Sequence, residues 1–130
     1  MAKKKKESIF TSKAPAVIGP YSQAVRAGDY LFISGQLPVD SMTGEKGVSI
    51  TQQTRLCLHN LLAILEAAGV GAHAVVKTTV YMKNLSVFSE MNTIYEGFFN
   101  EPFPARETIQ AAALPKGADV EISAIAYIGK

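Results

Sequence analysis

Residues 120–128, near the C-terminus, read VEISAIAYI and alternate strictly between two sets of side chains. Because successive side chains of a β-strand point to opposite faces of its sheet, this alternation predicts a strand with one wholly apolar face. The other face carries Glu121, Ser123, Ile125 and Tyr127. The chain must therefore build a layer that covers one face of a sheet, and it places a carboxylate on the opposite face.

A helix that can supply this cover is predicted from residue 50 to about residue 68. Ser49 and Gln52 have the spacing of a capping box, in which the serine accepts a hydrogen bond from the Gln52 amide and the glutamine reaches back. Gly69 follows, where helices often end. Cys57 belongs to the apolar stripe of this helix, so we interpret it as a small core residue rather than a nucleophile. The stripe comprises Cys57, Leu58, Leu61, Leu62, Ile64, Leu65 and Ala68.

A second helix is predicted from Ser86, as its cap, to about Phe99, and Asn92 falls beside its apolar stripe. That stripe comprises Phe88, Met91, Tyr95, Phe98 and Phe99. Between the two helices, the β-rich residues 74–82 alternate between two sets of side chains, which predicts a strand, and one set occupies one face of that strand. The set is Val76, Thr78, Val80 and Met82. Strands are predicted at residues 8–11, 22–26, 30–34, 74–82, 108–114 and 120–128.

Two tight connections are predicted between strands. Ala27, Gly28 and Asp29 should join residues 22–26 to residues 30–34 as a hairpin. Pro115, Lys116 and Gly117 should form a turn that makes the last two strands a terminal hairpin. The order of elements favours an α+β fold, a mixed six-stranded sheet with both helices on one face. The other face is left bare, and in so short a chain its natural cover is another copy, which favours a small ring with sites at its interfaces.

Arg106 and Glu121 are the candidate working groups. Pro102 and Pro104 restrict the backbone that leads to Arg106. The residue types leave ordinary roles open as well, since an arginine beside prolines often binds loop carbonyls and a glutamate near a strand start is often solvated. Tyr21 ends a loop rich in proline and glycine and is either a site residue or a buried phenol.

Composition limits the classes of protein that fit. The chain has 130 residues, 48% of them hydrophobic, which suits one compact domain, predicted at residues 8–130 after a polar tail at residues 1–7. A single cysteine excludes an internal disulfide, and His59 and His73 stand apart from other metal ligands, so no metal or cofactor is expected. We expect no membrane segment and a cytoplasmic protein.

Nucleic acid is not an expected partner of the folded body. The four lysines at positions 3–6 contribute four positive charges to a formal net charge of +2, so the rest of the chain carries a net −2. A basic tail of this kind is most simply a solvated terminus, with nuclear targeting or RNA binding as the alternative.

Several blocks, in order along nearly the whole chain, resemble the Rid family of reactive intermediate deaminases and most closely its RidA subgroup. The blocks are IGPYSQA at residues 18–24, FISGQ at 32–36, VKTTV at 76–80, YEGFF at 95–99, FPAR at 103–106, LPKGA at 114–118 and VEI at 120–122. The resemblance implies a chorismate-mutase-like fold and a homotrimer that encloses a central barrel, with clefts between subunits.

The same resemblance implies hydrolysis of 2-imino acids, such as 2-iminobutanoate and 2-iminopropanoate, to 2-oxo acids and ammonia. By position, Arg106 matches the residue that holds the substrate carboxylate and Glu121 the acid that activates water. Tyr21, Ser34, Gly35, Asn92 and Thr108 match the residues that bind substrate in the cleft. Alternatives are an endoribonuclease or translation inhibitor, and a ligand-binding or chaperone-like trimer without turnover.

The sequence departs from this pattern at two positions that bear on the site. Thr108 stands where many RidA members have a cysteine, and we expect activity to survive because water is the nucleophile and the backbone carbonyl the useful group. Glu107 directly follows Arg106 where many members have a small residue. Strand alternation should turn Glu107 away from the side of the sheet that Arg106 faces.

Overall fold

The computed structural model describes residues 5–129, which form a six-stranded sheet and two α-helices. The strands are β1 (Glu7–Ile9), β2 (Ala24–Ala27), β3 (Tyr30–Gln36), β4 (Val75–Met82), β5 (Ala105–Gln110) and β6 (Val120–Tyr127). The helices are α1 (Ile50–Ala67) and α2 (Phe88–Phe98), and three short 3-10 turns are η1 (Ala72–Ala74), η2 (Leu85–Val87) and η3 (Pro115–Gly117). The strand order is β1-β2-β3-β6-β4-β5, with β5 parallel to β4 and the other pairs antiparallel.

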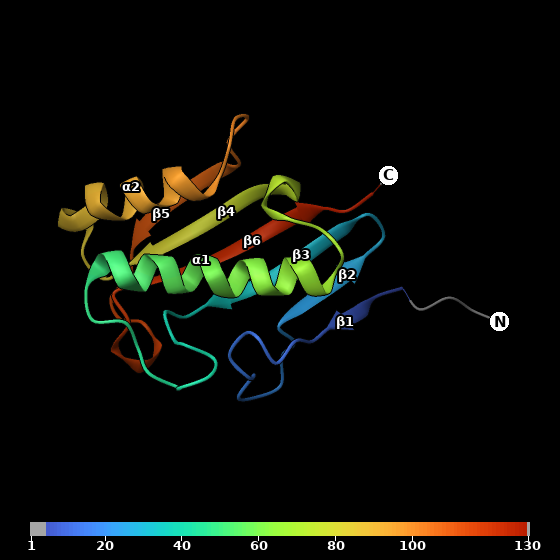
Figure 1. Cartoon of the computed structure of the whole chain (residues 1–130), viewed down its shortest axis with the longest axis horizontal. Coiled ribbons are helices and arrows are strands. Elements are labelled where there is room, and N and C mark those ends of the chain that lie inside the picture. Colours follow the sequence, from blue (N-terminus) through green and yellow to red (C-terminus); the bar gives the residue numbers. More distant parts are fainter. Residues whose placement is uncertain (1–4, 130) are drawn as a thin grey trace.

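Both helices cover the same face of this sheet, with α1 lying across β6 and β3 and α2 near β4 and β5 (Figure 1). The predicted α+β class, the mixed sheet and the one-sided helical layer are confirmed. The apolar side chains of β6 form the centre of the core, because Val120, Ile122, Ala124 and Ala126 are all buried under the helices. The alternate residues from Glu121 to Tyr127 lie on the open face, as their spacing predicts.

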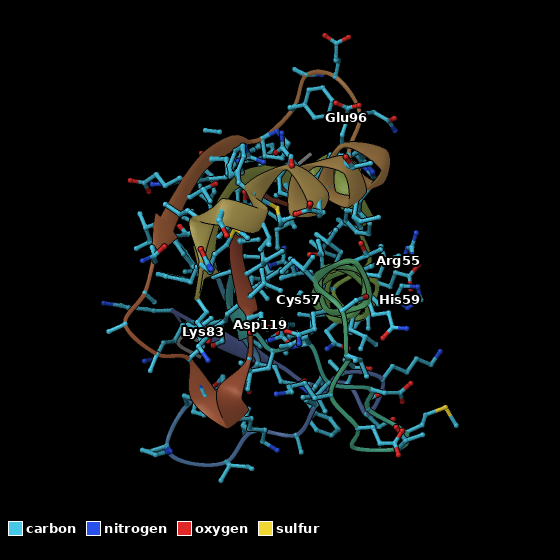
Figure 2. All side chains as sticks on the ribbon, turned by 90° about the vertical axis from the view of Figure 1, so that its left-hand side faces the viewer. Arg55, Cys57, His59, Lys83, Glu96 and Asp119 are labelled. Carbon is cyan, nitrogen blue, oxygen red and sulfur yellow. The ribbon has the colours of Figure 1, made fainter. Side chains whose placement is uncertain are left out.

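The first helix forms as predicted. Ser49 accepts a hydrogen bond from the Gln52 amide at 3.1 Å, and the Gln52 side chain reaches back to the amide of Val48 at 3.0 Å. Gly69, with φ of +85°, follows the last turn in the left-handed conformation that suits glycine there. Cys57 is fully buried and points from α1 toward the sheet (Figure 2). Burial raises the pKa of its thiol well above the ordinary value, which agrees with a core role.

The predicted terminal hairpin is wrong. β6 inserts between β3 and β4, and β5 lies parallel to β4 at the edge of the sheet. A parallel neighbour needs a long crossover, and α2 provides it between β4 and β5. The last strand has the continuous apolar face that a central position needs, while β5 (ARETIQ) is polar enough for an edge. β5 also begins earlier than predicted, so Arg106 lies inside it.

Two smaller predictions are also wrong. Ser86 does not cap α2; it lies in η2, where the Asn84 side chain accepts a hydrogen bond from the Ser86 amide at 2.9 Å. In β4 the register shifts between Val75 and Lys77, so Val75 is buried and Val76 is exposed. The alternation from Thr78 to Met82 holds.

The predicted tail at residues 1–7 is only partly described: residues 1–4 lie outside the described residues, and Glu7 already belongs to β1. Within residues 5–129, no helix combines the length and the hydropathy needed to cross a membrane.

Candidate active site

Glu121 lies on the open face of β6, directly beside a glycine of β3. The pairing of β3 with β6 is irregular between Ile33 and Gln36, and Gly35 falls in this interval. A Cβ atom at Gly35 would lie only 2.8 Å from the carboxyl carbon of Glu121 and would collide with one carboxylate oxygen. The absence of a side chain at Gly35 is therefore what makes room for the Glu121 carboxylate.

The Glu121 carboxylate opens into a pocket of about 550 Å³. The wall is largely apolar and also includes three of the predicted site residues, Tyr21, Ser34 and Gly35. Its remaining members are Pro15, Ala16, Val17, Ile18, Gln23, Gln36, Leu37, Val39, Pro115 and Lys116. A pocket of this kind, apolar with a few converging polar groups, is typical of small-molecule sites.

Burial raises the pKa of Glu121 above its ordinary value. The cause is desolvation, which penalises the charged carboxylate in this partly enclosed position. A carboxylate with a raised pKa is a stronger base than one in water. Glu121 therefore has the chemistry of a general base.

Tyr21 and Ser34 take different positions at the wall of this pocket. Tyr21 is 52% exposed, which contradicts its interpretation as a buried phenol. Its hydroxyl accepts a long hydrogen bond, 3.5 Å, from the Ile18 amide. The Ser34 hydroxyl donates to the carbonyl of Ser22 at 2.6 Å, so this side chain already has one partner inside the fold.

Arg106 lies in a second pocket, of about 350 Å³, beside α2. Its Nη1 donates to Oδ1 of Asn92 at 2.7 Å, and its guanidinium lies 4.7 Å from the ring centre of Tyr95 and 5.4 Å from that of Phe88. Aromatic faces attract a guanidinium, and the amide oxygen fixes its rotation. The remaining donors of this planar fork suit a carboxylate.

The neighbours of Arg106 on β5 alternate as predicted. Glu107 turns to the other side and forms an ion pair with Lys77, with 2.9 Å between Nζ and Oε1. Thr108 lies on the same side as Arg106, and its hydroxyl is buried without a hydrogen-bond partner among the described residues.

Within one chain, the structure does not bring Arg106 and Glu121 together. β4 lies between β5 and β6, and the two side chains lie on opposite faces of the sheet. Thr78, the register partner of Arg106, is buried under the helices, whereas Glu121 projects from the open face. The site residues fall into two groups, Tyr21, Ser34, Gly35 and Glu121 in one pocket and Asn92 and Arg106 in the other.

Sequence reasoning placed Tyr95 and Phe88 only in the core stripe of α2. The structure adds a second role, because both rings hold the Arg106 guanidinium. The Tyr95 hydroxyl also lies 2.7 Å from the hydroxyl of Thr78, which anchors α2 to β4. The signal was present in the sequence, since Phe88, Asn92 and Tyr95 recur at helical spacing on one face.

Other chemistry-bearing side chains lie elsewhere. Arg55 and His59 project from the side of α1 that faces away from the sheet (Figure 2). Among residues 5–129, no three histidine, cysteine, aspartate or glutamate side chains gather closely enough to hold a metal ion.

The chain is similar to known proteins over nearly its whole length. A family model described as endoribonuclease L-PSP matches residues 11–128. A RutC family protein of Pyrococcus horikoshii is 52% identical over 124 residues, 94% of this chain and 98% of that protein. A 2-iminobutanoate/2-iminopropanoate deaminase of Escherichia coli is 46% identical over 123 residues, 92% of this chain and 96% of that protein.

Among solved structures, that of Escherichia coli TdcF with bound serine superposes with a TM-score of 0.91. The two chains are 41% identical in sequence, and the match covers 95% of this chain and 99% of the TdcF chain. The fold, the matched length and the identities agree with the resemblance that the sequence blocks indicate. The chain therefore belongs to the endoribonuclease L-PSP family, and its relatives include proteins named RutC and RidA.

Proposed function

We propose that this protein hydrolyses 2-imino acids to 2-oxo acids and ammonia. The observation that carries the proposal is the Glu121 carboxylate, which lies in an apolar pocket with a raised pKa and against a glycine that makes room for it. The Escherichia coli relative at 46% identity bears the name of this activity, for 2-iminobutanoate and 2-iminopropanoate.

The complete site forms between copies of the chain. One chain holds its base and its guanidinium in separate pockets, and a substrate with a carboxylate next to its reacting carbon needs both. The open face also carries exposed large apolar side chains, which favour association with another copy. They are Tyr30, Phe32, Ile109 and Tyr127. A homotrimer with one cleft at each interface, as the family resemblance implies, would join the Glu121 pocket of one copy to the Arg106 pocket of the next.

In this cleft, Arg106 holds the substrate carboxylate through two parallel hydrogen bonds. Glu121 takes a proton from a water molecule as the water oxygen bonds to the imine carbon. The C=N π electrons move to nitrogen, which takes a proton from solvent water. The carbinolamine then collapses: Glu121 gives its proton to the amine nitrogen, the C–N bond breaks, and the hydroxyl releases its proton to solvent as the 2-oxo acid forms. One imine and one water yield one oxo acid and one ammonia.

The reaction needs only a modest reduction of its barrier, because such imines already hydrolyse in water. Holding the carboxylate and one water in line with a placed base supplies orientation and proton transfer. The Tyr21 hydroxyl and the backbone at Gly35 border the same pocket and are proposed to orient the ligand. Asn92 orients the arginine, and the Thr108 carbonyl is proposed as a further contact.

A coupled assay tests this proposal. Threonine dehydratase generates 2-iminobutanoate from threonine, and the decay of the enamine and imine absorbance is followed with and without this protein. The intact chain should accelerate the decay, and Arg106→Ala and Glu121→Ala should not. Absence of acceleration over the dehydratase alone would rule out this function for this substrate.

A further inference from the structure

The turn η3 (Pro115–Gly117) forms part of the pocket wall around Glu121, through Pro115 and Lys116. Two consecutive residues of this turn have left-handed backbones, with φ of 59° at Lys116 and 64° at Gly117. A residue with a side chain rarely adopts this conformation unless its surroundings impose it. Contacts from elsewhere in the chain are therefore needed to hold the turn.

Lys46 supplies such contacts from a distant loop. Its Nζ donates to the carbonyl of Lys116 at 3.3 Å and to that of Gly117 at 3.0 Å. These two carbonyls belong to the two left-handed residues. Lys46 is itself exposed, and its ammonium bridges the loop after β3 to the loop before β6.

One buried residue of α1 holds both of the loops that Lys46 connects. Gln53, 1% exposed, donates from Nε2 to the carbonyl of Gly47 at 2.9 Å and to Oδ2 of Asp119 at 3.2 Å. Its Oε1 accepts from the amide of Asp119 at 2.8 Å. Gly47 directly follows Lys46, and Asp119 lies two residues before Glu121, so both loops are anchored at one point.

The loop that carries Lys46 also forms the facing part of the pocket wall. Leu37 and Val39 line the pocket, and buried Asn60 of α1 donates to both of their carbonyls, at 2.9 and 3.0 Å. The Lys46 side chain thus connects two segments of the chain that line the same pocket.

We propose that Lys46 is a positioning residue that keeps the Pro115–Gly117 turn in its pocket-lining conformation and so sets the affinity for the ligand. The inference rests on the proposed function and deepens it. Among the described residues Lys46 forms no hydrogen bond or ion pair with Glu121, so its replacement should leave the Glu121 carboxylate in place and instead lower the fraction of molecules whose pocket is formed. Apparent affinity falls in proportion to that fraction.

The test compares Lys46→Met, which keeps the aliphatic stem and removes the donors, with Lys46→Arg, which keeps donors. Arg55→Met is the matched control, since it removes one positive charge from the outer side of α1. For imine hydrolysis, Lys46→Met should raise KM by about 3- to 10-fold with kcat within about twofold. Lys46→Arg should return KM most of the way to the parental value, and Arg55→Met should have the KM and kcat of the parent.

Hydrogen exchange provides a readout that does not depend on activity. The amides of Gly117 and Ala118 donate to the carbonyls of Leu114 and Pro115 within the turn, at 3.3 and 3.1 Å. Their exchange should accelerate in Lys46→Met and return toward the parent rate in Lys46→Arg. Unchanged exchange, or faster exchange with an unchanged KM, would overturn the positioning role. An intact chain with no turnover would instead remove the proposed function, and the exchange rates alone would then decide whether Lys46 holds the turn.

Discussion

Gly35 and Glu121 occupy one small volume that a single added methyl group would fill. Gly35→Ala should displace the carboxylate and lower kcat/KM by about 10-fold or more, because small misplacements of a catalytic group are costly. Gly97→Ala is the matched control, since nothing lies within 4 Å of a Cβ built at Gly97 of α2. Steady-state kinetics of both variants check this, and equal activity of Gly35→Ala and the parent would contradict the close approach.

Glu121 should make both activity and stability depend on pH. As the proposed base it must be ionised, so kcat/KM should fall on acidification with an apparent pKa above the ordinary value of a glutamate. If kcat/KM instead fell with an apparent pKa at or below the ordinary value of a glutamate, that result would contradict the effect of burial. The rate of uncatalysed hydrolysis, measured at each pH, is subtracted.

Stability should respond with a defined sign. Because the pKa of Glu121 is raised on folding, its protonated form stabilises the fold below the unfolded pKa, and this contribution is lost as pH rises through the folded pKa. Glu121→Gln, which stays neutral, should therefore gain stability over the parent as pH rises and match it in acid. Urea unfolding at a series of pH values measures the difference. If the stability of Glu121→Gln relative to the parent instead fell with rising pH, the pKa of Glu121 would not be raised on folding.

The Arg106 guanidinium should bind the substrate carboxylate through two parallel hydrogen bonds, and its positive charge alone should not be enough. Arg106→Lys keeps the charge but loses the bidentate geometry, so kcat/KM should fall by about 10- to 100-fold, as expected for one charged hydrogen bond. Arg55→Lys serves as the control because Arg55 points away from the sheet (Figure 2). An Arg106→Lys variant with parental kinetics would exclude the carboxylate-binding role.

At the scale of elements, α2 both covers the sheet and carries the partners of Arg106. The hydroxyls of Tyr95 and Thr78 form a buried hydrogen bond of 2.7 Å between α2 and β4. Tyr95→Phe leaves the Thr78 hydroxyl without that partner and should cost about 1–3 kcal/mol in the free energy of unfolding. The ring above Arg106 remains, so activity at low temperature should persist. Denaturant unfolding and kinetics of the same variant separate the two roles.

The elements differ in how far the sequence could predict them. α1 was predictable to within a residue because its cap, its stripe and Gly69 all act locally. The strands that pair with β5 could not be predicted in this way. Their pairing depends on the crossover through α2, and strands that are adjacent in sequence need not be adjacent in the sheet. Arg106 and Glu121 stood out by residue type, but their separation onto opposite faces follows from the pairing that the sequence did not reveal.

At the scale of the whole molecule, the pocket of Glu121 and the pocket of Arg106 are separate within one chain. A single chain presents the Glu121 carboxylate on its open face and the Arg106 guanidinium beside α2, with the sheet between them. The apolar side chains on the open face are exposed in one chain, and burying them between copies would stabilise an oligomer. Assembly and catalysis are therefore coupled in this account: a variant that stays monomeric should lose imine hydrolysis while it keeps its fold.

The most direct test of this account is complementation between two inactive variants. Arg106→Ala and Glu121→Ala chains are each purified, mixed in equal amounts, unfolded and refolded together, and native mass spectrometry confirms that mixed oligomers form. If each site takes its base from one copy and its guanidinium from the next, about one quarter of the sites in a random mixture are intact, and about that share of parental activity should return. Mixed oligomers without recovered activity would contradict a site shared between copies.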